Sequence, residues 1–106
     1  MNETLFTEYP GTVDAIRRYL RAALPHAELT EGEDFERDGI RFRIEPGRLV
    51  FFSHEFLSDF SEAEAAARLK SWRVGNKAQA LDPGLTLFVT TEGTFVERSP
   101  GRRQSE

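Results

Sequence analysis

The chain has 106 residues, a formal net charge of −4 and no cysteine. Its length is that of one domain, and the lack of cysteine excludes disulfides, thiolate chemistry and cysteine-based zinc sites. No stretch approaches the roughly 18 apolar residues of a membrane span, and the N-terminal sequence MNETLFTEYPG lacks the basic and apolar regions of a signal peptide. We therefore expect a cytoplasmic protein with a single domain over residues 1–98 and a disordered tail over residues 99–106.

The first predicted element is a helix over residues 12–24, with Thr12 as its N-cap and Pro25 as its stop. Apolar side chains recur at helical spacing along one face of this helix: Val13, Ile16, Leu20, Ala23 and Leu24. Before the helix, Leu5 and Phe6 are expected to lie on the core as a brief extended arm.

Residues 34–53 predict three consecutive antiparallel strands, and residues 27–30 predict a short edge strand before them. Asp38 and Gly39 are expected to form a two-residue loop of type I′, a turn that requires positive φ at both positions. This loop sets three cross-strand pairs: Phe35 with Phe42, Glu36 with Arg41 and Asp34 with Arg43.

Residues 46–47, a Pro-Gly pair, predict the second reversal as a type II turn. With a two-residue loop at this point, Phe51 joins the core face of the sheet. The opposite face then carries four side chains: Arg41, Arg43, Val50 and Phe52. A slip of one residue would exchange the two faces of the third strand, which is apolar on both.

A second helix is predicted from Ser61 to about residue 72, because Ser61 and Glu64 have the spacing of a capping box. Gly75 is expected just beyond its end, at a position that favours glycine. Residues 77–81 then predict a short strand before a turn.

The last predicted element is a hairpin of residues 85–91 and 94–98 with a Glu-Gly turn. The turn sets two cross-strand pairs: Val89 with Val96 and Thr90 with Phe95. Alternation places Phe88 on the same face as Phe95. The elements together predict an α+β domain whose mainly antiparallel, twisted sheet combines a three-stranded meander with this hairpin. Two helices complete it, in the order α-β-β-β-α-β-β.

His54, Glu55 and Asp59 are the nearest approach to a catalytic or metal-binding cluster. A helical zinc site needs two ligands on one face and usually a second histidine, and His26 is the only other one. The acidic run over residues 28–38 lacks the order of a calcium loop. We therefore expect no catalytic residue, no metal and no cofactor, with a small-molecule site near His54 as an alternative.

A basic surface is the second alternative, because five arginines could share it: Arg17, Arg18, Arg21, Arg41 and Arg43. The order of one helix, three strands and one helix resembles the double-stranded RNA-binding domain. That family opens its second helix with basic residues, whereas this one opens with Ser61, Glu62 and Glu64. Because phosphate contacts dominate nucleic-acid affinity, this acidic start disfavours nucleic acid as the partner.

A second resemblance is to the YbjN-like bacterial family and the related type III secretion chaperones. It is carried by the helix end Leu-Lys-Ser-Trp at residues 69–72, and by residues 78–89 with their turn at 82–84. The closing helix of those families has no counterpart in residues 94–106. The resemblance implies a non-enzymatic dimer that binds other proteins.

The expected function is therefore a non-enzymatic protein-binding adaptor or chaperone-like module that acts as a small homodimer. We expect its partner surface to be the face that carries Arg41, Arg43, Val50 and Phe52, because exposed apolar area of this extent usually marks an interface. The alternative is that a helix covers this face and Phe52 belongs to the core.

Overall fold

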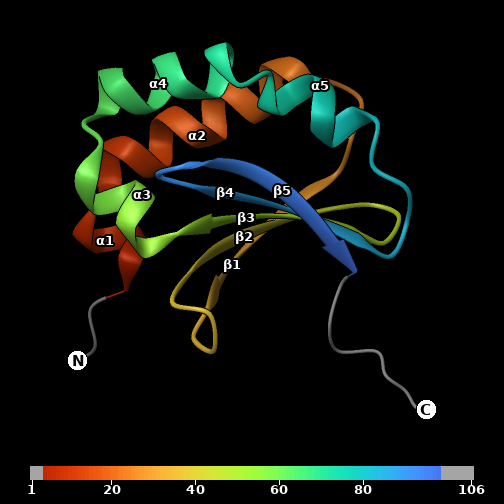
Figure 1. The fold of residues 1–106 in the computed structure, drawn as a ribbon, viewed down its shortest axis with the longest axis horizontal. Coiled ribbons are helices and arrows are strands. Elements are labelled where there is room, and N and C mark those ends of the chain that lie inside the picture. The colour runs from red at the N-terminus through yellow and green to blue at the C-terminus, as the bar shows by residue number, and fades with distance from the viewer. Residues whose placement is uncertain (1–3, 99–106) are drawn as a thin grey trace.

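The computed structural model describes residues 4–98, which form a five-stranded sheet with helices gathered on one side of it (Figure 1). The helices are α1 (Leu5–Glu8), α2 (Pro10–Ala23), α3 (His54–Asp59), α4 (Glu62–Ser71) and α5 (Val74–Gln79). The strands are β1 (Leu29–Asp34), β2 (Gly39–Ile44), β3 (Arg48–Ser53), β4 (Leu85–Thr90) and β5 (Gly93–Arg98). The predicted α+β class is confirmed. The predicted tail at 99–106 lies outside the described residues.

The strands lie side by side in sequence order, from β1 at one edge to β5 at the other. Every neighbouring pair is antiparallel except β3 and β4, which are parallel. A parallel pair needs a long crossover connection, and α3, α4 and α5 supply it. The predicted meander and C-terminal hairpin are both present. α2 and α4 are the two predicted helices, whereas α1, α3 and α5 are additional.

The chain before α2 is helical, so the predicted extended arm is wrong. Thr4 caps α1 by accepting a hydrogen bond from the Thr7 N–H at 3.3 Å. α2 begins at Pro10, a residue that suits a first turn because it has no N–H to leave unpaired. Thr12 is therefore not the N-cap; it is buried, and its hydroxyl donates to the Phe60 carbonyl oxygen at 3.3 Å.

Both ends of α4 match the prediction, since Ser61 is the N-cap and Trp72 is the C-cap, but the segment after the helix does not. Ser61 Oγ accepts from the Glu64 N–H at 3.1 Å, and a Glu64 carboxylate oxygen accepts from the Ser61 N–H at 2.9 Å. The predicted strand over residues 77–81 is wrong, because most of it belongs to α5. Gly75 lies inside α5, and its N–H donates to Tyr19 Oη at 2.8 Å. Gly75 thus serves close packing of α5 on α2.

The loop between β1 and β2 has four residues rather than two, because Asp34 pairs with Gly39. The Asp34 carboxylate accepts a hydrogen bond from the Arg37 N–H at 3.1 Å and forms an ion pair with its guanidinium at 2.9 Å. These local bonds favour a turn that starts at Asp34. The three predicted cross-strand pairs are consequently wrong. Phe35 lies in the loop with 82% of its surface exposed.

The loop between β2 and β3 has three residues, because Ile44 pairs with Arg48. This added residue moves β3 by one position relative to the predicted register. Val50 therefore lies opposite Phe42 on the face that the helices cover, and Phe51 lies on the other face. The predicted faces of β3 are exchanged, since side chains alternate along a strand.

The C-terminal hairpin has a two-residue loop at residues 91–92, one position earlier than predicted, because Thr90 pairs with Gly93. The predicted pairing of Val89 with Val96 is wrong, since Val96 lies opposite Leu87. The shift does not change the faces of the two strands. Phe88 and Phe95 lie opposite each other on one face, as predicted.

One hydrophobic core fills the space between the helices and the sheet. It includes Ile40, Phe42, Val50, Phe52, Leu87 and Val89 from the strands and Val13, Ile16, Leu20, Phe56, Leu57, Leu69 and Val74 from the helices. Every helix contributes to this one layer, so the opposite face of the sheet is left without helices. We call that opposite side the open face.

Candidate interaction site

The structure separates the four residues that were predicted as one partner-binding surface. Val50 and Phe52 have no exposed surface and lie in the core beneath the helices. Arg41 and Arg43 lie on the open face, since their strand alternates with the buried Ile40 and Phe42. The prediction that the four share a face is wrong, and the alternative that helices cover Phe52 is correct. The cause is the additional residue in the loop between β2 and β3.

Three phenylalanines run across the open face from β3 to β5, and we call them the aromatic row: Phe51, Phe88 and Phe95. The ring centroids of Phe51 and Phe88 are 5.4 Å apart, and those of Phe88 and Phe95 are 4.9 Å apart with planes only 3° from parallel. The Arg37 guanidinium lies 5.6 Å from the centre of the Phe88 ring. Such ring contacts stabilise both partners.

The exposure of the aromatic row increases sharply at its end. Phe51 and Phe88 are 5% and 7% exposed, because neighbouring strands and the Arg37 side chain flank them. Phe95 is 46% exposed, since β5 is the last strand and no further strand lies beyond it in the sheet of residues 4–98. The row thus ends in an aromatic ring with one uncovered side.

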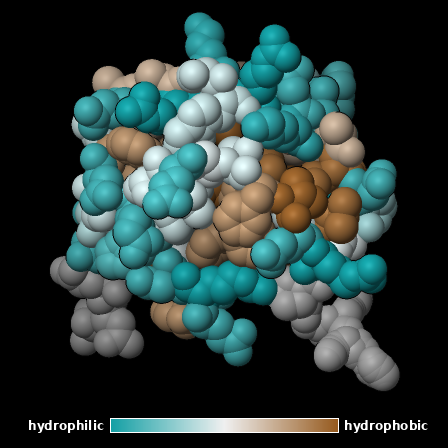
Figure 2. Space-filling model, viewed as in Figure 1, coloured by the Kyte–Doolittle hydropathy of each residue, from teal (hydrophilic) through white to brown (hydrophobic). Residues whose placement is uncertain are grey.

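β5 exposes apolar side chains on both of its faces. Val96 alternates with Phe95, points to the helix side and is 49% exposed. Figure 2 shows brown, apolar atoms gathered over β5 on one side of the molecule. A side chain from a helix reaches β5 at Thr94, where the Lys77 ammonium of α5 donates a hydrogen bond to the Thr94 hydroxyl at 2.7 Å.

Among residues 4–98, no strand pairs with the outer edge of β5, so the backbone polar groups at this edge have no partner in the sheet. Residues of an antiparallel pair alternate between hydrogen-bonded and non-hydrogen-bonded positions, and a turn hydrogen bond joins the residues that flank a two-residue loop. Gly93, Phe95 and Glu97 therefore bond to β4. Thr94, Val96 and Arg98 direct their N–H and C=O groups away from the sheet, where another strand can pair with them.

The opposite edge of the sheet is protected by charge. β1 carries Glu31 and Glu33 on the face toward the helices, and inward-pointing charges are a common way to prevent a strand from pairing. The Glu31 carboxylate accepts from Arg17 Nε and, at 2.8 Å, from Arg17 Nη2. Glu33 accepts from the Leu5 N–H at 3.4 Å. On the corresponding face of β5, Thr94 and Val96 are uncharged, and the charged residue of that face, Arg98, lies at the end of the strand.

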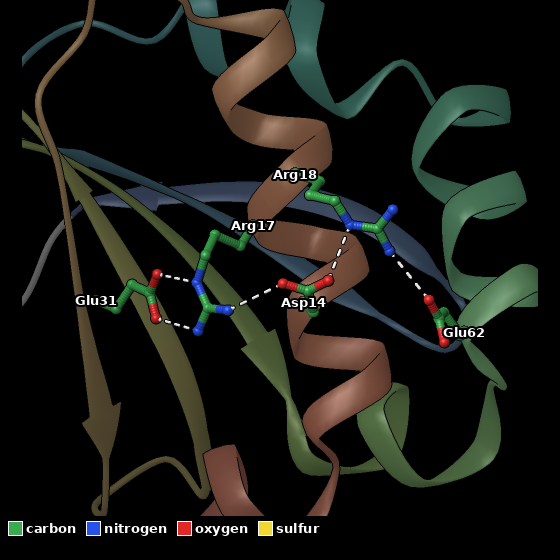
Figure 3. A network of polar contacts seen from close by, with 5 residues as sticks. All are labelled: Asp14, Arg17, Arg18, Glu31 and Glu62. Carbon is green, nitrogen blue, oxygen red and sulfur yellow. Dashed lines mark hydrogen bonds and ion pairs between the residues drawn. The ribbon is translucent and has the colours of Figure 1, made fainter.

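Arg17 and Arg18 of α2 are held in ion pairs within the chain (Figure 3). Asp14 lies between them, 3.2 Å from Arg17 Nη1 and 2.9 Å from Arg18 Nε. Arg18 also reaches Glu62 of α4 at 3.0 Å. The hydrogen bonds that Arg17 donates to the Glu31 carboxylate are the main reason that the pKa of Arg17 is raised above its ordinary value. The arginine surface predicted as a nucleic-acid alternative is therefore neutralised at both of these positions.

The arginines of β2 are engaged as well. Arg41 Nη1 donates to the Glu33 carbonyl oxygen at 2.9 Å, and Arg43 Nε lies 3.7 Å from a Glu45 carboxylate oxygen. Arg43 thus has a carboxylate beside it, whereas Arg41 bonds to a backbone carbonyl oxygen, so the face is mixed in charge at Arg43. A mixed face attracts phosphate much less than a basic one.

His54 has partners that the sequence did not reveal. Its Nε2 lies 3.1 Å from Tyr9 Oη, and its Nδ1 lies 3.1 and 3.2 Å from the two Asp38 carboxylate oxygens. Glu55 and Asp59, the predicted companions, are not among these contacts. The three side chains form a hydrogen-bonded series that can polarise the Tyr9 hydroxyl. The same contacts connect the start of α3 with the junction of α1 and α2. The structure marks Asp38 as unusual in one further way, because its backbone has a positive φ of 59°.

Neither a metal site nor a membrane span is found in the part of the chain that the structure describes. No group of three or more His, Cys, Asp or Glu side chains in residues 4–98 is arranged to hold a metal ion. No helix among these residues is long and apolar enough to cross a membrane. No family model matches the chain, and comparisons with curated proteins and with solved structures give no match either.

Proposed function

We propose that this chain is a non-enzymatic adaptor or chaperone-like module of the cytoplasm, which binds an extended polypeptide strand along the outer edge of β5. The observation that carries the proposal is the combination at β5 of outward N–H and C=O groups with exposed Phe95 and Val96. Backbone groups of a sheet edge give affinity to an added strand, and the side chains beside them give selectivity.

The rest of the surface supports a protein partner over nucleic acid. Arg17 and Arg18 are already paired with carboxylates, and Arg43 lies beside Glu45. The net charge of −4 also repels a phosphate backbone. The resemblance to YbjN-like proteins and type III secretion chaperones implies the same class of function, although the edge of β5 is proposed from this chain's own geometry.

The experiment compares the wild-type chain with Val96→Pro and with a control, Phe35→Ser. Proline at Val96 removes an outward N–H and leaves the bonds between β5 and β4, so the variant is expected to fold. Phe35 is more exposed than Phe95, but it lies in the loop between β1 and β2 and not on a strand edge, so it serves as the control. Each immobilised chain is offered an extract of the native cells, and the captured polypeptides are identified by mass spectrometry.

We expect Val96→Pro to lose the captured polypeptide and Phe35→Ser to retain it. Amide hydrogen exchange on the purified complex then locates the contact, with slower exchange expected at Val96 and Arg98 than in the free chain. Capture that Val96→Pro leaves unchanged, or protection confined to the helices, would refute the proposed function.

A further inference from the structure

We propose that the strand that pairs with β5 belongs to a second copy of this chain, so that two five-stranded sheets join into one continuous sheet across a two-fold axis. In this arrangement the two β5 strands are antiparallel and Phe95 lies directly opposite Phe95 of the second copy. The inference rests on the proposed function, since it names the occupant of the same edge.

Hydrogen bonding allows few registers for such a pair. The outward groups belong to Thr94, Val96 and Arg98, and they must meet outward groups of the second copy. A symmetric pair therefore has its two-fold axis at a residue of β5. Axes at Phe95 and at Val96 each pair five of the six residues of β5, whereas axes at Thr94 and at Glu97 pair three.

Side chains separate these registers, and an axis at Thr94 is disfavoured because it sets Val96 against the loop residue Glu92. An axis at Glu97 opposes two carboxylates, which repel each other. An axis at Val96 places each Phe95 ring opposite a Glu97 carboxylate, which would lose water without gaining a partner. An axis at Phe95 pairs the two aromatic rings, and it brings Arg98 of each copy to the loop that carries Glu92 of the other. Opposite charges and paired aromatic rings both stabilise adjacent strands.

The aromatic row gives the second reason for an axis at Phe95. The row runs from Phe51 through Phe88 and stops at Phe95, whose outer side is uncovered. Because Phe95 lies on the open face in both copies, the axis places two rows end to end on the same face of the joined sheet. The half-exposed ring of each row then covers that of the other.

Single cysteines test the register, because the chain has no cysteine of its own. In the proposed register, Phe95→Cys brings two thiols to directly opposed positions, which suits a disulfide. Glu97→Cys places its thiols about 13 Å apart along the strands, too far for a disulfide. Val96→Cys places its two thiols two residues, or about 7 Å, apart along the strands. With the spacing between the strands added, their Cα atoms are too far apart for a disulfide.

We expect Phe95→Cys to form a covalent dimer under mild oxidation, and Val96→Cys and Glu97→Cys to remain uncoupled. Sedimentation of the wild-type chain over a range of concentrations should show a monomer–dimer equilibrium, with Val96→Pro monomeric and Phe35→Ser unchanged. Arg98→Glu and Glu92→Arg should each weaken the dimer roughly three- to tenfold, and the double variant should recover it.

A wild-type chain that stays monomeric at the highest concentration, or a Val96→Pro variant that still forms the dimer, would overturn the proposal. Efficient coupling of Glu97→Cys or Val96→Cys in place of Phe95→Cys would overturn the register. A monomer whose β5 amides are protected by a captured foreign polypeptide would refute the second copy as occupant while leaving the proposed function intact. A wild-type chain that neither forms a dimer nor captures a polypeptide would refute the two together.

Discussion

Gly39→Ala is expected to be among the most destabilising single-methyl additions in this chain. A Cβ at Gly39 would lie 2.3 Å from the Phe52 carbonyl oxygen and 2.4 Å from Cζ of the Phe51 ring. Ordinary carbon–oxygen contacts are no closer than about 3.3 Å. The methyl group therefore forces β2 and β3 apart by about 1 Å at this point, or moves the Phe51 ring out of the aromatic row.

The reason differs from the one that the turn pattern suggests. Gly39 is the first residue of β2, and positive φ occurs at Asp38 instead. Close approach of Phe51 and the β3 backbone, rather than backbone conformation, is what excludes a side chain at Gly39. Overpacking of a buried site costs about 1–3 kcal/mol, and two hard contacts at one position favour the upper end. We expect a loss of about 3 kcal/mol, which corresponds to roughly 12–24 °C in Tm for a domain of this size.

Chemical denaturation followed by circular dichroism measures the loss, with Gly32→Ala as the matched control. Gly32 lies in the edge strand β1, and a Cβ there would meet only the Arg41 guanidinium at 3.7 Å, an ordinary contact. The control is expected to change the free energy of unfolding by no more than about 0.5 kcal/mol. Equal losses for the two variants, or a loss below about 1 kcal/mol for Gly39→Ala, would refute the packing argument.

Three further substitutions test the core and one helix cap by the same denaturation assay. Phe42→Ala should cost about 3–5 kcal/mol, because the ring is only 1% exposed; a loss below about 1 kcal/mol would contradict its place in the core. Ser61→Ala should cost about 1 kcal/mol through the lost cap, and no change would mean that the capping box is not formed in solution. Phe52→Glu should unfold the domain, since a carboxylate would be buried without a partner. A folded Phe52→Glu variant by circular dichroism would place Phe52 on the surface after all.

A register error by an even number of residues leaves side chains on their predicted faces, whereas an error by an odd number exchanges the faces. This difference decides how much of the sheet could be predicted from the sequence. In the first hairpin the predicted partner of Phe42 is Phe35 and the observed partner is Glu31, a shift of four residues. An even shift preserves the faces of residues that stay in the strands, so Ile40 and Phe42 still share one face, which is buried, whereas Phe35 lies in the loop. In β3 the shift is one residue, and it moves Phe52 from the expected surface into the core.

Loop length is the quantity that the local sequence did not determine. Asp38 and Gly39 have the composition of a two-residue loop, but the side-chain bonds of Asp34 to Arg37 start the turn earlier. The capping box at Ser61 was predictable because both of its partners lie within three residues. The contacts of His54 with Tyr9 span 45 residues, so no local pattern contains them.

The two edges of the sheet differ in the features that control strand pairing, and this difference is the reason that association is proposed at β5. β1 places Glu31 and Glu33 toward the helices, where Arg17 and the Leu5 N–H bind them; another strand would have to pack beside these charges. β5 places Val96 at the corresponding face and Phe95 on the open face, both about half exposed. A strand added at β5 therefore gains backbone bonds and covers apolar surface on both faces, whereas one added at β1 gains the bonds alone. For that reason the apolar residues of the sheet that are free to bind a partner lie at its last strand, and not on the buried face of β3.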